Sequence, residues 1–228
     1  MKNSKSFLSI LQSVDAFFPI GAFTLSNGLE DYVIRERIGQ SRELAEYLEG
    51  FLQIFAYNDL GLVSLAYQNA ERQAVLLKLD GIANAMKTSS EVRMGSIRMC
   101  SRYLKAREAM QDCAGTLNWY REQIHRKKAV GFHPIALGIY GASVGIERET
   151  LLYLYAYSVI SGIVNNAVKL VPLSQMDGQK ILFEALEHLD EVIQEAQRVD
   201  VESLGISGGA SEIHCMNHER LYSRLYMS

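Results

Sequence analysis

The last fifteen residues contain the side chains of this sequence that are best suited to binding a metal ion. His214, Cys215 and His218 fall within five positions, and histidines four positions apart share one face of a helix. Imidazole and thiolate groups are ligands for nickel, copper and zinc. Three ligands on a terminal segment would make a weak site, however, and the same side chains could instead pack or form hydrogen bonds when the segment docks.

A second group of reactive side chains lies near the N-terminus, in the stretch DAFFPIGAFTLSNGLEDY, residues 15–32. Its carboxylates, Asp15, Glu30 and Asp31, could act as a general acid and a general base. The stretch supplies no third group for such a site. Carboxylates near helix starts at least as often cap the helix or interact with its dipole. A catalytic loop, a phosphate cradle and the edge of a protein interface are therefore the three interpretations to separate.

Composition and missing motifs argue against nucleic-acid binding, nucleotide binding and hydrolase chemistry. The net charge of −3, with both signs mixed along the chain, provides no broad cationic face for nucleic acid. Neither the G-x-x-x-x-G-K-[ST] phosphate loop nor the G-x-S-x-G nucleophile elbow occurs. The histidines have no identifiable nucleophile partner. We therefore predict a protein that is not an enzyme and has no catalytic, cofactor-binding or metal-binding residues of its own.

The cysteine content and the N-terminus favour a cytoplasmic protein. Cys100, Cys113 and Cys215 are an odd and sparse set, which suits a reducing compartment better than a disulfide framework. The first residues lack the sustained apolar run and the small-residue cleavage pattern of a signal peptide, and Asp15 interrupts them.

The spacing of apolar residues predicts an all-α fold. Prolines are rare, strand-like alternation never persists, and apolar residues recur at intervals of three and four. Helices are predicted over 41–57 with Ser41 as N-cap, 59–70, 74–87, from Ser89 or Ser90 to about 110, 115–128, from His133 to 146, 150–168, and 174–199. Residues 203–212 are rich in glycine and serine and predict a flexible connector. We expect a single-domain helical bundle over 1–202 and a flexible partner-binding tail over 203–228.

Two long stretches without charged residues, 129–146 and 150–168, raise the question of a membrane hairpin. Their glycines, hydroxyl groups and amides favour buried helices in a soluble bundle, so no membrane contact is expected. Glycines at spacings of three and four keep one face of the first helix thin, which lets a neighbouring backbone approach closely. The equally apolar 150–168 helix is the expected neighbour.

Several blocks of the chain resemble, in order, the UreF family of urease accessory proteins. The blocks are LSILQSVDAFFPIGAFTLSNGLE (8–30), EVRMGSIRMCSRYL (91–104), HPIALGIYGASVGI (133–146), NNAVKLVPLSQMDGQKILFEAL (165–186) and HERLYSRLYMS (218–228). The sequence departs from the family pattern at Ala22, Asn27 and Ser174, where the family usually has glycine, and Met227 replaces a usual second arginine. Asparagine adopts positive φ more readily than alanine or serine, so the turn geometry at the other two positions is in question.

The resemblance implies an all-α protein that dimerises and acts without catalysis. It would bind a second accessory protein, UreD (also called UreH), and recruit the GTPase UreG, and the assembly would deliver nickel to apo-urease. It implies that nickel and GTP are handled by the GTPase. A nickel carrier that uses His214, Cys215 and His218 is the alternative.

The same resemblance indicates partner-binding residues. By position, Glu30, Asp59, Lys169 and Arg224 resemble polar residues of the family that are implicated in the GTPase-facing surface or in its fidelity. The tail residues His218, Tyr222 and Arg224 are expected to become ordered when the UreD-like partner binds. Asp15 joins these as a candidate contact at the edge of an interface.

Overall fold

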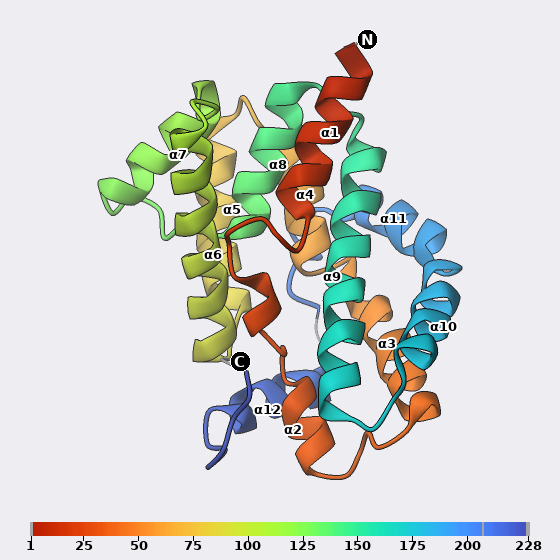
Figure 1. Ribbon diagram of the computed structural model, residues 1–228. Helices are drawn as coiled ribbons and strands as arrows, with labels where there is room; N and C mark the ends of the chain where they lie inside the picture. The colour runs from red at the N-terminus through yellow and green to blue at the C-terminus, as the bar shows by residue number, and fades with distance from the viewer. Residues whose placement is uncertain (1, 207, 227–228) are drawn as a thin grey trace.

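The uncharged stretches of the sequence form the centre of the structure, a computed structural model that describes residues 2–206 and 208–226. They fold into α8 (His133–Val144) and most of α9 (Arg148–Leu170). All residues of α8 from His133 to Gly141 are buried, because α4 and α6 pack against it. Figure 1 shows α8 and α9 inside a ring of other helices. The described residues contain no β-strand, so the predicted all-α fold is confirmed.

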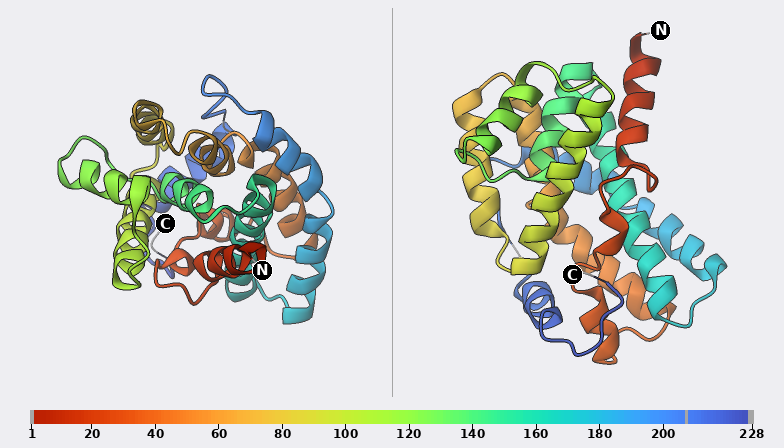
Figure 2. Two further views of the ribbon diagram at one scale, coloured as in Figure 1. Left: turned by 90° about the horizontal axis from the view of Figure 1, so that it is seen from above. Right: turned by 60° about the vertical axis from the view of Figure 1, so that its left-hand side comes forward.

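The remaining helices pack around this pair and leave part of α9 exposed (Figures 1 and 2). Helices α4, α5, α6 and α7 lie on the α8 side, and α3, α10 and α11 lie on the α9 side. Their bounds are α1 (Lys2–Val14), η1 (Ala22–Thr24), α2 (Leu29–Ile34), α3 (Ser41–Phe55), α4 (Asp59–Gln68), α5 (Gln73–Met86), α6 (Ser90–Ala109), α7 (Gly115–His125), α10 (Gln175–Leu186), α11 (Leu189–Arg198) and α12 (Gly209–His218). The single helix predicted over 174–199 is thus two helices, with a turn at residues 187–188.

The thin face of α8 packs mainly on α4. A Cβ added at Gly138 would lie 2.5 Å from the carbonyl oxygen of Val63, so only glycine permits this approach. Gly141 faces Leu151 of α9, as the sequence predicts. The expectation that α9 is the close neighbour was therefore right at Gly141 and wrong at Gly138. Helix α4 takes that place because it is apolar around most of its circumference, with residues 60–66 all buried.

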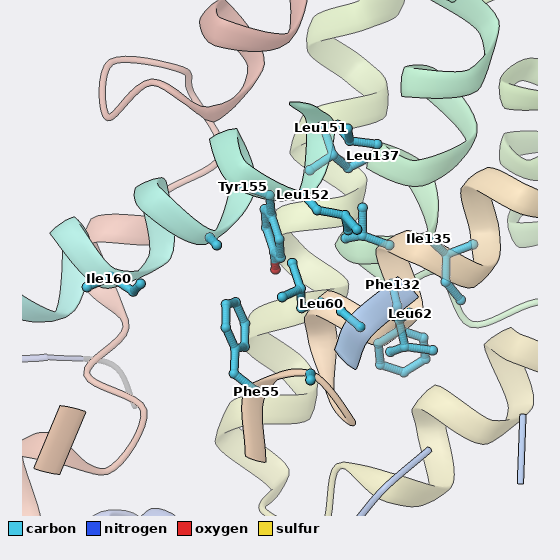
Figure 3. Close-up of a cluster of buried hydrophobic side chains, with 14 of the residues drawn as sticks. Phe55, Leu60, Leu62, Phe132, Ile135, Leu137, Leu151, Leu152, Tyr155 and Ile160 are labelled. Atoms are coloured by element: carbon cyan, nitrogen blue, oxygen red, sulfur yellow. The ribbon is translucent and has the colours of Figure 1, made fainter. Parts of the chain in front are cut away.

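The core between these helices is a continuous set of aliphatic and aromatic side chains. Figure 3 shows Phe55, Leu60, Leu152 and Tyr155 packed together, where α3, α4 and α9 meet. Cys100 of α6 belongs to this core and is 1% exposed. Helix α9 is, among the described residues, the helix long and apolar enough to cross a membrane, but half of the relevant stretch is buried inside the protein. We interpret it as a core helix, as predicted.

Buried polar groups fix the parts of the chain that lead into this core. The guanidinium group of Arg107, 1% exposed, lies 3.8 Å from the centre of the Tyr140 ring and donates hydrogen bonds to Ser13 of α1 and to the Tyr140 hydroxyl. Asp80, 2% exposed, accepts hydrogen bonds from the Tyr120 hydroxyl and from two backbone N–H groups of the loop before α8. These bonds compensate the burial of both charges.

The departures from the family pattern have local explanations. Asn27 has a φ of 52°, which fits the expectation that asparagine replaces glycine at positive φ. Ala22 begins the short helix η1, and the left-handed position before it is kept by Gly21. Ser174 has a φ of −75° and forms a capping box with Asp177 at the start of α10. Alanine and serine therefore replace glycine at positions without positive φ.

His133 is the first residue of α8, where a helix is predicted to start, and is 3% exposed. Its ring meets the Tyr103 ring edge-on, with the ring centres 5.3 Å apart. Burial lowers the pKa of His133 to about 4, with smaller opposing effects from Asp59, which raises it, and Lys87, which lowers it.

We predict that His133 makes the stability of the fold depend on pH. Its folded pKa of about 4 lies below the value of about 6.5 for an unfolded chain. The unfolded chain therefore binds more protons in this range, and stability is lost as the pH falls from about 6.5 to about 4, by roughly 3 kcal/mol. Urea unfolding across this range should show that the free energy of unfolding falls more steeply with decreasing pH in the wild type than in His133→Gln. Parallel curves would contradict the prediction.

Candidate functional site: the docked tail

The C-terminal tail packs across α2 and the start of α6, at the end of the molecule remote from the N-terminus (Figures 1 and 2). The tail here means residues 203–206 and 208–226, because residues 207, 227 and 228 of the predicted connector and tail lie outside the described residues. Helix α12 starts at Gly209, so the predicted connector 203–212 is wrong for its last four residues. We call Gly28, Glu30, Asp31, Tyr32 and Glu91 the tail receptor.

Glu30 is the centre of the contact. Its side chain is buried and accepts hydrogen bonds from His218 Nε2 at 2.9 Å, from the Leu225 N–H at 2.6 Å and from the Tyr226 N–H at 3.1 Å. The carboxylate thus binds one side chain and two backbone groups of the tail. Charge-assisted hydrogen bonds of this kind are among the stronger ones in proteins.

His218 bridges two carboxylates. Its side chain is fully buried, and its Nδ1 lies 2.7 Å from Glu91 Oε2 while its Nε2 faces Glu30. Glu91 also forms an ion pair with Arg224. Both ring nitrogens of His218 are therefore engaged when the tail is docked.

A second histidine of α12 is held in the same way. His214 Nδ1 lies 2.6 Å from a carboxylate oxygen of Asp31, which also accepts a hydrogen bond from Arg35. The His214 ring stacks on Tyr32, with the ring centres 3.5 Å apart. Asp31 is completely buried, and these contacts compensate its Oδ2 atom, whereas its Oδ1 atom makes no hydrogen bond to a described residue.

Gly28 lets the tail reach this position. It has a φ of 85°, and an added Cβ would lie 3.0 Å from the backbone nitrogen and from the Sγ atom of Cys215. A side chain at Gly28 would therefore meet the backbone of α12, which cannot move aside as a flexible side chain could. The sequence SNGLEDY thus provides one close backbone contact followed by two carboxylates and an aromatic ring.

The tail also completes the start of α6. Glu219 accepts hydrogen bonds from the N–H groups of Ser90 and Glu91, at 2.8 and 3.3 Å, and from the Ser89 hydroxyl at 3.1 Å. Ser89 precedes the helix as predicted, but its side chain binds the tail and forms no cap of its own. Burial alone would raise the pKa of Glu219, but these hydrogen bonds outweigh it and lower the pKa.

In the docked tail, the metal-ligand side chains of the sequence are engaged in other contacts. His214 and His218 face carboxylates, and burial raises the pKa of the Cys215 thiol to about 12, which disfavours the thiolate needed for metal binding. In the part of the chain that the structure describes, no group of three or more His, Cys, Asp or Glu side chains is arranged to hold a metal ion.

The docked tail exposes several apolar side chains, beside the exposed polar residues Glu219, Arg220 and Ser223. Ile213 is 58% exposed, Met216 41% and Leu225 63%, and Tyr222 is fully exposed. The histidines and Arg224 point toward the bundle instead. Exposed apolar side chains gathered on one segment mark an interaction surface.

The other predicted site residues lie apart from this contact. Asp15 is exposed and accepts a hydrogen bond from the Phe17 N–H, which closes the turn after α1. Asp59 opens α4 and forms an ion pair with Lys87, with 2.6 Å between the Lys87 Nζ and Asp59 Oδ1 atoms. Lys169 is exposed in the last turn of α9, where positive charge suits the helix dipole. Sequence reasoning missed Glu91, because nothing in its own segment distinguishes it from a solvated helix residue.

Comparisons with known proteins find relatives that match nearly the whole chain. A family model described as UreF matches residues 38–186. The chain is 36% identical over 223 residues to the urease accessory protein UreF of Actinobacillus pleuropneumoniae serotype 5b (strain L20), covering 96% of this chain and 98% of the relative. It is 37% identical to the protein of that name from Haemophilus influenzae (strain PittGG), with 96% and 94% covered. The identity to that of Bacillus sp. (strain TB-90) is 33%, with 97% and 98% covered.

We predict that Gly28→Ala releases the tail. The new methyl group contacts the Cys215 backbone and also strains a position with positive φ, whereas Gly115→Ala strains a position with a φ of 54° where an added Cβ meets open space. Trypsin should therefore cleave the Gly28→Ala protein after Arg220 several times faster than the wild type. Gly115→Ala should leave the cleavage rate unchanged. Equal rates in both variants would show that the close contact does not hold the tail.

Proposed function

The chain belongs to the UreF family of urease accessory proteins, and we propose that it acts in urease maturation as a non-catalytic scaffold. The observation that carries this proposal is the full-length match to relatives that bear the urease accessory name. A scaffold works through its surfaces. The exposed apolar side chains of the docked tail provide such a surface.

The proposed assembly contains three kinds of partner. A UreD/UreH-like accessory protein binds this chain, a UreG-like GTPase is recruited and modulated by it, and the complex delivers nickel to apo-urease in the cytoplasm. Nickel and GTP are handled by the GTPase, and the chain itself carries no cofactor. Two copies of the chain form a dimer, so that each assembly presents two sets of surfaces.

The structure supports different roles for the proposed partner-binding residues. Glu30, His218 and Arg224 hold the tail on the bundle, so they act on a partner by positioning that segment. Tyr222 is fully exposed and is suited to direct contact with the UreD/UreH-like protein. Lys169 is exposed on α9 and is suited to direct contact with the GTPase.

We predict that removing residues 206–228 leaves a folded helical protein that no longer captures the UreD/UreH-like protein. The core of α3 to α11 does not depend on the tail for its apolar packing, so the circular dichroism spectrum should remain helical. The measurement is a pull-down from cells that co-express the urease accessory proteins. Retained capture by the truncated chain would contradict the proposal.

Point variants separate the outward face of the tail from the loss of the whole segment. Tyr222→Ser and Leu225→Ser each remove an exposed apolar side chain without touching a carboxylate contact. Met176→Ser removes a side chain that is 65% exposed on α10 and serves as the matched control. Capture of the partner should fall about tenfold in each tail variant, as for a contact worth about 1.4 kcal/mol. It should not change in the control.

Equilibrium dialysis with nickel tests the alternative of a nickel carrier. Because both ring nitrogens of His218 face carboxylates in the docked tail, the scaffold proposal expects weak, substoichiometric binding that His218→Ala does not alter. One tightly bound nickel ion per chain, lost in the His218→Ala variant, would favour the carrier instead.

A further inference from the structure

A partly open cavity of about 590 Å³ lies behind the docked tail. Its walls are mostly apolar and include Leu11 of α1, Phe55 of α3, Met99 of α6 and Tyr155 of α9, together with Phe18 of the segment after α1. Helix α12 contributes Ser211, Glu212 and Cys215, so the docked tail forms part of the wall. The volume lies within the range of pockets that hold small organic molecules, about 300–1,000 Å³.

Three of the described residues that line this cavity each carry a buried polar atom without a hydrogen-bond partner. They are His133 with its Nε2 atom, Ser96 with its Oγ atom and Asn166 with its Oδ1 atom. Each of these residues is at most 3% exposed. A buried polar atom that makes no hydrogen bond is costly, which favours an occupant that can donate hydrogen bonds to it.

The charges around the cavity determine which sign of charge a ligand can carry. Three carboxylates line it, those of Asp15, Asp59 and Glu212, and the one ammonium group there, that of Lys87, is already paired with Asp59. Burial keeps His133 neutral at physiological pH. Within the described part of the chain, Asp15 and Glu212 have no cationic partner, although Glu212 accepts a hydrogen bond from the Thr88 hydroxyl. These two carboxylates repel a negatively charged ligand and attract a cation.

We propose that this cavity binds an organic amine, a small molecule with an apolar body and a protonated amino group. The body lies against the aromatic and aliphatic walls, and the ammonium group donates hydrogen bonds to the acceptors at the rim. Since Glu212 belongs to the tail, docking of the tail completes the site. This inference concerns the interior of the bundle and does not depend on the outward face of the tail.

Two glycine positions give a matched pair of variants for the test. Gly162 lines the cavity from α9, and an added Cβ there meets nothing within 4 Å, so Gly162→Leu fills space without a clash. Gly81 on α5 is equally open, but it is exposed and remote from the cavity walls, so Gly81→Leu is the control. Replacing a helical glycine also favours the helix, so both variants should fold.

The experiment is isothermal titration calorimetry of the full chain with phenethylamine. The probes 3-phenylpropionate and ethylbenzene keep the same phenylethyl body but carry a negative charge and no charge, respectively. We expect saturable binding of one phenethylamine per chain to the wild type and to Gly81→Leu. Affinity should fall at least tenfold in Gly162→Leu and several-fold in Glu212→Gln, and 3-phenylpropionate should bind at least tenfold more weakly.

Several results would overturn the proposal. Phenethylamine could give no saturable heat with the wild type, or it could bind Gly162→Leu as well as it binds Gly81→Leu. Equal affinity for 3-phenylpropionate would show that the carboxylates do not select a cation. The same preparation of Gly162→Leu is also tested for capture of the UreD/UreH-like protein. Capture should be unchanged, because the scaffold proposal rests on the tail surface and not on the cavity.

Discussion

The carboxylate of Glu30 is the group on which the arrangement at this end of the molecule depends. A carboxylate that is buried must be compensated, and its compensation comes from His218 and from two backbone N–H groups of the tail. The neighbouring Asp31 is compensated by His214 and Arg35. The bundle therefore carries two buried charges whose histidine partners lie 183 and 188 residues further along the chain. The tail is required to compensate these two buried carboxylates, although it adds little to the apolar core.

This dependence explains the order of residues in SNGLEDY. Asn27 and Gly28 turn the chain at positive φ, and Gly28 lacks the side chain that would exclude the backbone of α12. The next turn then directs Glu30 and Asp31 toward the tail. The stretch has the residue types of a catalytic loop because a catalytic loop and a receptor for a polar segment both need positioned carboxylates. Here the carboxylates bind groups of the same chain, which identifies the stretch as a receptor for the tail.

The sequence predicted the helices more completely than it predicted this contact. Apolar periodicity is local, so α3 and α8 are readable from their own residues, and the resemblance to a family supplied Glu30 and His218 as candidates. The bridge through Glu91 joins three segments that are distant in sequence, and no local pattern indicates such a pairing. For the same reason, Gly138 was assigned to the wrong neighbour. Helix α12 was missed because its glycine and serine residues favour a connector.

The distribution of polar and apolar residues on the tail constrains how a partner can use it. An ordinary amphipathic helix buries its apolar face, whereas this segment buries His218 and leaves Tyr222 and Leu225 exposed. A partner that bound the inward face would have to expose Glu30 and Asp31 or supply new compensation for both. A partner that binds the outward face gains apolar contact and leaves the carboxylate network intact. The second arrangement requires no broken ion pair, so a docked tail is already in the conformation that such a partner would bind.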